Sequence, residues 1–173
     1  MYERGRKSPL LFYKNMISKE TVEKLALERM TELNNNLYIV ELTVSASNNI
    51  QLELDKSEGY VSVEDCISVS RNIEHNLDRE TVDFELNVSS AGIDKPLRHP
   101  LQFLKYIGKE VDIKLQNGTV QSGVLVAHEK SNTRIEVERK EKVEGKKKKV
   151  TVTEVLEFSS NEIKEVKVKI SFK

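Results

Sequence analysis

The chain has 173 residues, and 28 basic side chains balance 28 acidic ones, so the formal net charge is zero. No stretch approaches the roughly 18 apolar residues of a membrane-spanning helix. The single cysteine excludes an internal disulfide and suits a reducing, cytoplasmic environment. The zero conceals a division: up to Ala91 there are 10 basic and 16 acidic residues, and from Gly92 onward 18 basic and 12 acidic. We therefore expect two modules of opposite charge, the second suited to an anionic partner.

The first elements follow from a change of hydrophobic period. Residues 1–15 show no pattern, and we interpret them as a flexible tail before a functional start at Met16. Alternating apolar residues predict a hairpin of strands over 38–44 and 50–54. Before this hairpin, apolar residues at helical spacing predict an amphipathic helix that Ser18 caps, with one face formed by Val22, Leu25, Ala26, Met30 and Leu33.

A second helix and a third strand complete the first module. Ser62 and Asp65 have the spacing of a capping box that opens a helix. Its periodicity predicts an inner face of Val63, Cys66, Ile67, Ser70, Ile73 and Leu77. Alternation over 82–88 predicts a strand. Residues 16–91 should therefore form an α-β-β-α-β domain in two layers, helices on one face of a small sheet.

The second half has a different character. Pro96 and Pro100 restrict the residues before them, so 92–100 is expected to be a stiffened junction. One short helical turn should follow within 101–107, and then five short strands up to Phe172. This pattern predicts a small SH3-like or Sm-like β-barrel over 101–173, which makes the whole chain α+β.

The sequence carries no motif for catalysis. A phosphate-binding loop, a dinucleotide fingerprint, a nucleophile elbow and a zinc-binding His-Glu-x-x-His are all missing. His75, His99 and His128 have no partner at ligand spacing, and Cys66 is expected to be an inert thiol on a helix. We expect no catalytic residue, no cofactor and no metal, hence no enzyme. A hydrolase site assembled from loops between the domains is the alternative.

The four consecutive lysines at 146–149 have two interpretations. They could form a solvated hairpin tip, since Glu141, Glu144 and Glu154 surround them, or they could contact RNA phosphates without reading sequence. No aromatic residues for base stacking lie nearby, and no G-x-x-G loop supports a KH-type module. The candidate phosphate contacts are Lys146, Lys147, Lys148 and Lys149.

The most distinctive stretch is 87–100, NVSSAGIDKPLRHP. Its serines can hydrogen-bond local backbone, its glycine permits positive φ, its aspartate can anchor a turn and its proline fixes that turn. Such a density of turn residues predicts a defined elbow. The candidate site residues are Ser89, Ser90, Gly92, Asp94, Lys95, Pro96 and Arg98.

Residues 88–97, VSSAGIDKPL, followed by Phe103 and the YIGKEV of 106–111, resemble the junction motif of the ribosome maturation factor RimP family. That motif reads roughly V-S-S-P-G-[LI]-[DE]-[RK]-P-L and leads to a Y-x-G-[KR]-x-[VI] strand start. The resemblance covers 16–173. The departures are Ala91 where many members have proline, the tail before Met16, and the Lys/Glu-rich insert 139–149.

The resemblance implies a non-enzymatic assembly factor. Members bind the free 30S ribosomal subunit in the cytoplasm and assist its late maturation, including incorporation of a small-subunit protein near the decoding centre. The expected partners are ribosomal protein and ribosomal RNA, with no membrane and no small-molecule substrate, and we expect a monomer. The alternative is an Sm-like RNA-binding regulator acting outside the ribosome, which would form rings.

Overall fold

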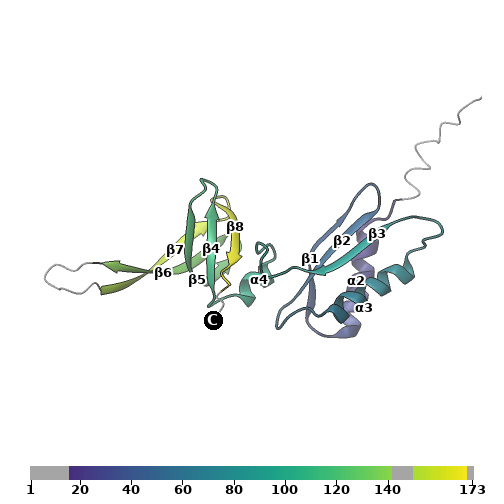
Figure 1. Cartoon of the computed structure of the whole chain (residues 1–173), viewed down its shortest axis with the longest axis horizontal. Coiled ribbons are helices and arrows are strands. Elements are labelled where there is room, and N and C mark those ends of the chain that lie inside the picture. Colours follow the sequence, from purple (N-terminus) through teal and green to yellow (C-terminus); the bar gives the residue numbers. More distant parts are fainter. Residues whose placement is uncertain (1–15, 142–149, 171–173) are drawn as a thin grey trace, which may run out of the picture. The chain divides into compact units, whose positions relative to one another are not determined.

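The computed structural model describes residues 16–141 and 150–170. The chain divides into two compact units, unit 1 (Met1–Ala91) and unit 2 (Gly92–Lys173), and each has its own hydrophobic core (Figure 1). The expectation of a flexible tail concerns residues 1–15, which lie outside the described residues.

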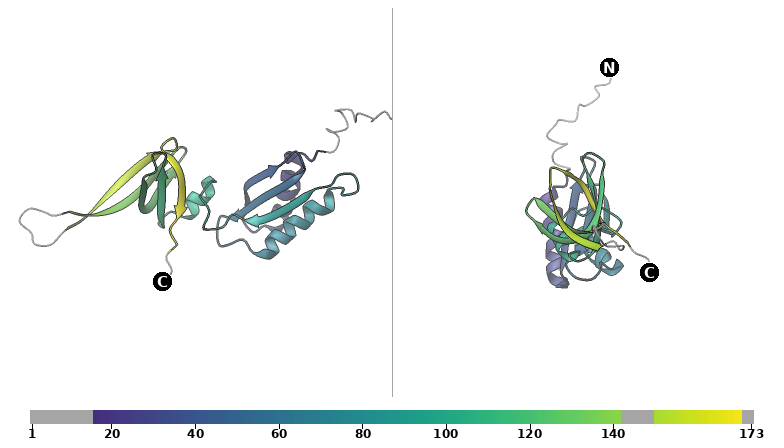
Figure 2. Two further views of the ribbon diagram at one scale, coloured as in Figure 1. Left: turned by 45° about the horizontal axis from the view of Figure 1, so that its top comes forward. Right: turned by 90° about the vertical axis from the view of Figure 1, so that its left-hand side faces the viewer.

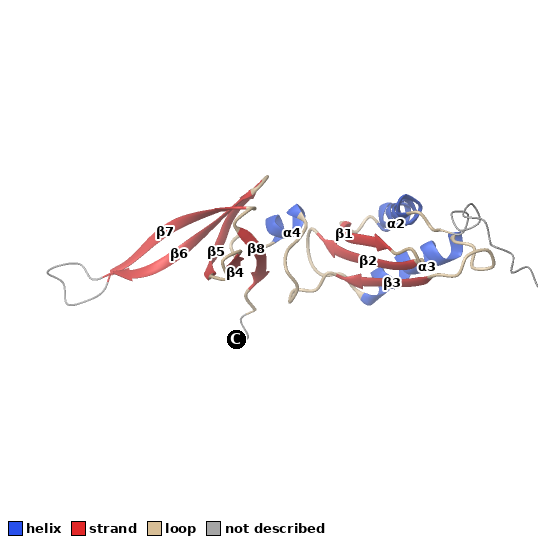
Figure 3. Ribbon diagram, turned by 90° about the horizontal axis from the view of Figure 1, so that it is seen from above, coloured by secondary structure: helices blue, strands red, loops and turns tan. Residues whose placement is uncertain are grey.

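Unit 1 is a three-stranded sheet with two helices on one face (Figures 2 and 3). Its elements are, in chain order, α2 (Lys19–Leu33), β1 (Leu37–Val44), β2 (Asn49–Lys56), α3 (Val63–Asn76) and β3 (Glu85–Ser90). The strand order is β1-β2-β3; β1 pairs antiparallel and β3 parallel to β2. The predicted succession of helices and strands is confirmed, and α3 is the crossover that a parallel pair requires.

The first helix forms as its sequence predicts. The Ser18 hydroxyl accepts a hydrogen bond of 3.1 Å from the Thr21 amide and so satisfies one free N–H group of the first turn. Val22, Ala26 and Met30 are buried at steps of four, against the strands. The helix ends where Asn34 adopts the left-handed conformation at φ 45°.

The second helix buries a different face from the predicted one. Its capping box between Ser62 and Asp65 is present, but Val63 is 70% exposed and Ile67 is 44% exposed. The buried face is Asp65, Val69 and Ile73, which lie on one side of the helix at steps of four; Val69 and Ile73 join the core and Asp65 pairs with Lys56 on β2. The inner-face prediction was therefore wrong for Val63 and Ile67.

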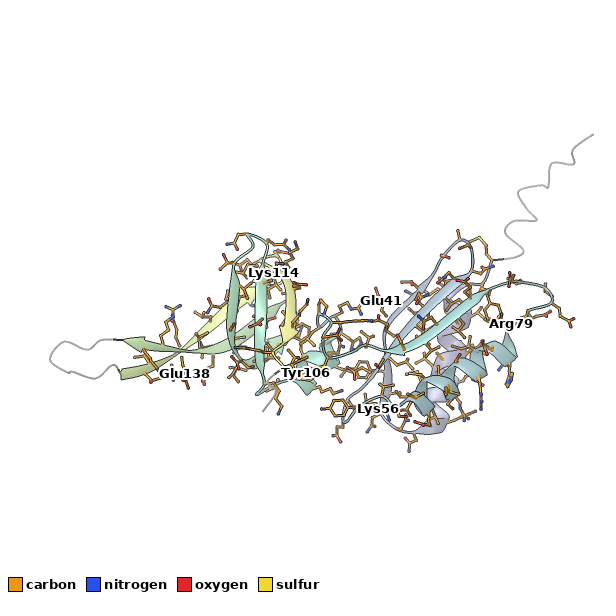
Figure 4. All side chains as sticks on the ribbon, viewed as in Figure 1. Glu41, Lys56, Arg79, Tyr106, Lys114 and Glu138 are labelled. Carbon is orange, nitrogen blue, oxygen red and sulfur yellow. The ribbon has the colours of Figure 1, made fainter. Side chains whose placement is uncertain are left out.

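Asp65 joins three elements of unit 1 at one carboxylate. It receives hydrogen bonds from the Asn35 amide at 2.6 Å and the Ser62 backbone at 2.8 Å, and forms an ion pair of 2.7 Å with Lys56, which Figure 4 labels. Burial raises the pKa of Asp65, but the Lys56 and Ser62 hydrogen bonds outweigh burial, so the pKa lies below its ordinary value. The Asp65 carboxylate thus connects the end of β2, the residues after α2 and the start of α3.

Unit 2 is a five-stranded antiparallel sheet preceded by a short helix. Its elements are α4 (Pro100–Lys105), β4 (Glu110–Leu115), β5 (Val120–Glu129), β6 (Asn132–Glu141), β7 (Val150–Ser159) and β8 (Ile163–Val168). The strand order is β7-β6-β5-β4-β8, and no pairing within the described strands joins β7 to β8. The sheet is thus open at both edges. Its buried hydrophobic residues are Val111, Ile113, Leu125, Ile135 and Val166, with Leu97 and Phe103 packed among them.

The β6–β7 hairpin is the longest pairing of unit 2 and forms a ribbon that extends beyond the other strands (Figure 1). Its register runs from Asn132 opposite Ser159 to Glu141 opposite Val150. Ile135 is buried, whereas Glu138 and Thr153, further along the ribbon, are exposed. Residues 142–149, which follow β6 in the sequence, lie outside the described residues.

We predict that Asp65→Asn destabilises unit 1 by about 3 kcal/mol, because it leaves the largely buried Lys56 ammonium without its carboxylate. Hydrogen exchange of the Ile50 and Val69 amides in the full chain measures this. Since the pKa of Asp65 is lowered in the folded state, its contribution is complete above about pH 4 and is lost as the pH falls through the lower folded value.

The matched control is Glu28→Gln, which removes an exposed ion pair with Lys24 and should change the free energy of unfolding by less than about 1 kcal/mol. Equal effects of the two substitutions, or an Asp65 effect that persists unchanged at pH 2, would contradict the assignment.

Candidate interface at the junction segment

The predicted site residues span the end of unit 1 and the start of unit 2. Ser89 and Ser90 are the last residues of β3 and lie opposite Glu53 and Leu54 of β2. The following Ala91 is 2% exposed, and its N–H donates to the Leu54 carbonyl at 2.8 Å. The sheet pairing of unit 1 therefore continues to the residue at which the unit ends.

A tight turn follows at Gly92. This residue has φ 72°, a conformation that favours glycine, and a Cβ placed on it would lie 2.7 Å from Asp94 Oδ1. The Asp94 carboxylate is thus folded back against the Gly92 backbone. Gly92 thus adopts the positive φ that a glycine permits, and the structure brings these two candidate residues together.

The rest of the segment is held by unit 2. Lys95 and Pro96 are half-buried, Leu97 is buried, and the Leu97 N–H donates to the Val166 carbonyl on β8 at 2.8 Å. Arg98 is exposed, but its backbone N–H donates to Gln102 Oε1 at 2.9 Å. The Arg98 side chain is thus presented on an ordered backbone.

Gln102 is the residue of this region that sequence reasoning missed. It is 2% exposed, and its side-chain oxygen accepts from both Arg98 and His99, which completes a capping box at the start of α4. His99 in turn accepts from the Leu101 N–H through Nδ1 at 3.2 Å. A glutamine three residues after a cap position was the available signal, although histidine is an unusual cap.

Among the described residues, Cys66 and His128, for which the sequence predicts no role, form no hydrogen bond with the candidate site residues. Cys66 is partly buried on α3, where burial and then the neighbouring Asp65 charge raise the pKa of its thiol. His128 stacks on the Phe103 ring with centroids 3.8 Å apart, and burial lowers its pKa. Within the described residues, no group of three His, Cys, Asp or Glu side chains could hold a metal ion. In that same part of the chain, no helix has the length and apolar character needed to cross a membrane.

The described residues of the two units differ in charge, but only unit 1 departs far from neutrality. Residues 16–91 carry 15 acidic and 6 basic side chains, whereas the described residues of unit 2 carry 12 basic and 11 acidic ones. Several of the basic groups in unit 2 form ion pairs, such as Arg134 with Glu129 and Lys114 with Glu165. Most of the positive excess of the second half therefore comes from residues 142–149 and from Lys173, and the candidate run 146–149 lies outside the described residues.

Comparisons with known proteins bear on both units. The family model described as RimP N-terminal domain matches residues 25–94. A ribosome maturation factor RimP from Christiangramia forsetii is 44% identical over 154 residues, which cover 89% of this chain and 99% of the relative. A protein of the same name from Flavobacterium psychrophilum is 38% identical over 79% of this chain and 88% of its own length.

A third relative from Porphyromonas gingivalis, also named ribosome maturation factor RimP, is 31% identical over 87% of this chain and 97% of the relative. The matched segments of these relatives thus extend over nearly their whole length, so they include unit 2 and not only the N-terminal domain. The junction motif, the order of elements and these matches agree: the chain belongs to the ribosome maturation factor RimP family.

Proposed function

We propose that this protein binds the free 30S ribosomal subunit in the cytoplasm and assists its late maturation, without catalysing a reaction. Family membership is the observation that carries the proposal, because relatives that align over almost their entire length are named ribosome maturation factors. It acts as a monomer on this proposal, with ribosomal protein and ribosomal RNA as partners.

The distribution of charge supports two kinds of contact. Unit 1 has an excess of carboxylates that suits a basic ribosomal protein, and the lysines of 146–149 suit RNA phosphates. We further propose that unit 2 is a small SH3-like or Sm-like barrel. In support, β8 returns beside β4, the first strand of the sheet, and one face of the sheet encloses the core.

The junction residues are proposed as part of the subunit-binding surface. Lys95 and Arg98 supply positive charge on a backbone that Gly92, Pro96 and the Leu97 hydrogen bond hold in one conformation. A preorganised surface loses less conformational entropy on binding than a flexible tether would. Asp94, beside Gly92, belongs to the same proposed surface, and Ser89 and Ser90, at the end of β3 in unit 1, are proposed as separate contacts with the subunit.

The proposal predicts that the full chain co-sediments with free 30S subunits and not with 70S ribosomes in a sucrose gradient. In a strain that lacks it, free subunits should accumulate relative to 70S particles. Binding to naked RNA together with ring-like self-association of the 19.8 kDa chain in analytical ultracentrifugation would instead support the Sm-like regulator. Absence of 30S binding would contradict the proposed function.

The lysine run gives a separate prediction. Changing Lys146, Lys147, Lys148 and Lys149 together to Glu should weaken 30S binding and reduce the slope of log K against log salt by about 3, since each phosphate contact contributes about 0.7 to 0.9. Changing the same four residues to Gln removes the charge without reversing it and should reduce the slope equally. A slope unchanged in both variants would assign the run to a solvated hairpin tip.

The turn at Gly92 gives a further prediction. Gly92→Val adds a Cβ that clashes with Asp94 at a positive φ, and we expect about tenfold weaker 30S binding from a rearranged turn. Gly59→Val is the matched control, because Gly59 has φ 74° but no atom within 4 Å of an added Cβ. Equal binding by both variants would show that 30S binding does not depend on the conformation of this turn.

A further inference from the structure

Unit 1 has a groove that the junction residues do not use. It lies between α3 and β3 and has a volume of about 400 Å³. Its apolar lining comes from both elements: Val63, Cys66 and Ile67 on the helix, and Leu86 and Val88 on the strand. Val63 and Ile67 are the residues that periodicity assigned to the core and that the structure leaves 70% and 44% exposed.

One wall of this groove is an open sheet edge. β3 pairs with β2 alone, at the end of the strand order β1-β2-β3 (Figure 3). The Glu85 N–H donates to the Asn48 carbonyl and the Ala91 N–H to the Leu54 carbonyl, so odd-numbered residues of this strand point toward β2. Because successive backbone groups of a strand point in opposite directions, those of Leu86, Val88 and Ser90 point away from β2.

Nothing in the sequence of β3 blocks this edge. Strands at sheet edges commonly carry proline, lysine or an inward-pointing charge that prevents another strand from pairing. The sequence of β3, ELNVSS, has no proline and no lysine, and its one charged residue, Glu85, is exposed at the start of the strand. An unblocked edge beside a half-apolar helix face is the arrangement in which an extended peptide adds to a sheet and places alternate side chains into a groove.

The charge of unit 1 indicates what kind of peptide fits. Residues 16–91 carry 15 acidic and 6 basic side chains, and the groove itself is lined by one residue of each charge, Glu74 and Arg71 on α3. An extended segment in which aliphatic residues alternate with Lys or Arg would place its aliphatic side chains against Val63 and Ile67. Its cationic side chains would then lie in the negative potential of the unit.

We propose that the α3–β3 groove binds an extended, lysine- or arginine-rich segment of a partner protein, which adds as a fourth strand beside β3. The inference deepens the proposed function, and identifying the partner as a ribosomal protein rests on that function. A second groove, on the outer face of α2, is lined by no described strand, and Leu27 is the one apolar residue described in its lining. It therefore lacks the backbone edge on which strand addition depends.

The direct test is hydrogen exchange by NMR on the full chain with a synthetic peptide of about nine residues that alternates valine with lysine. Strand addition should slow exchange of the Leu86, Val88 and Ser90 amides at least tenfold on addition of the peptide. The Glu85 and Ala91 amides, which already donate to β2 or its preceding turn, should change little. A control peptide with glutamate in place of lysine should bind at least tenfold more weakly.

Ile67 and Leu27 are apolar residues with similar exposure, so the same substitution at each position gives a matched pair of variants. Ile67→Lys, at a position 44% exposed in the groove, should weaken binding of the valine–lysine peptide at least about tenfold. Leu27→Lys, at a position 47% exposed on α2, adds the same charge to the same unit and should leave binding unchanged. Val88→Pro removes one outward N–H without removing a bond to β2 and should weaken binding similarly.

The proposal is overturned if the three outward amides gain no protection, if the glutamate peptide binds as tightly, or if Ile67→Lys and Leu27→Lys behave alike. A second group of results would also overturn it, in which these amides are already protected in the free chain. Loss of that protection on removal of residues 1–15 would make this chain's own segment the occupant, and loss of protection on dilution would make a second copy the occupant. Retained 30S co-sedimentation alongside such a result would leave the proposed function intact.

Discussion

The parallel pairing of β2 with β3 is the constraint on which most of unit 1 depends. A parallel pair needs a crossover, and α3 supplies it, so the helix is held against the sheet on the side of β3. The same pairing carries the chain to Ala91, whose N–H still donates to the β2 carbonyl of Leu54. It thereby fixes the point at which the junction turn begins. It also leaves β3 at the edge of the sheet, with half of its backbone groups directed outward.

Local signals in the sequence predict local structure well. The capping residues Ser18 and Ser62 are both confirmed as N-caps, and the alternation that predicts the first hairpin corresponds to β1 and β2. These features depend on neighbours within a few residues, so the sequence contains what determines them. The positive φ of Gly92 belongs to the same class, because a glycine among turn residues is a local signal.

Features that depend on distant residues were not predictable in this way. The rotation of α3 places Asp65 beside Lys56, nine residues earlier and on another element, whereas periodicity alone favoured the more apolar face. The buried Gln102 and the edge position of β3 likewise follow from packing and strand order. The candidate site was therefore predictable as a stretch of sequence, whereas the groove beside β3 required the structure.

Along the β6–β7 ribbon, side chains that belong to the core of unit 2 give way to side chains that are exposed. Each strand has ten residues, or about 33 Å at 3.3 Å per residue, and among the side chains that the structure describes the buried ones, such as Ile135, lie near its base. Exposed positions further along the ribbon, such as Glu138 and Thr153, touch no core whose packing a new side chain would disturb. They are therefore positions at which related chains can change their side chains with little loss of stability.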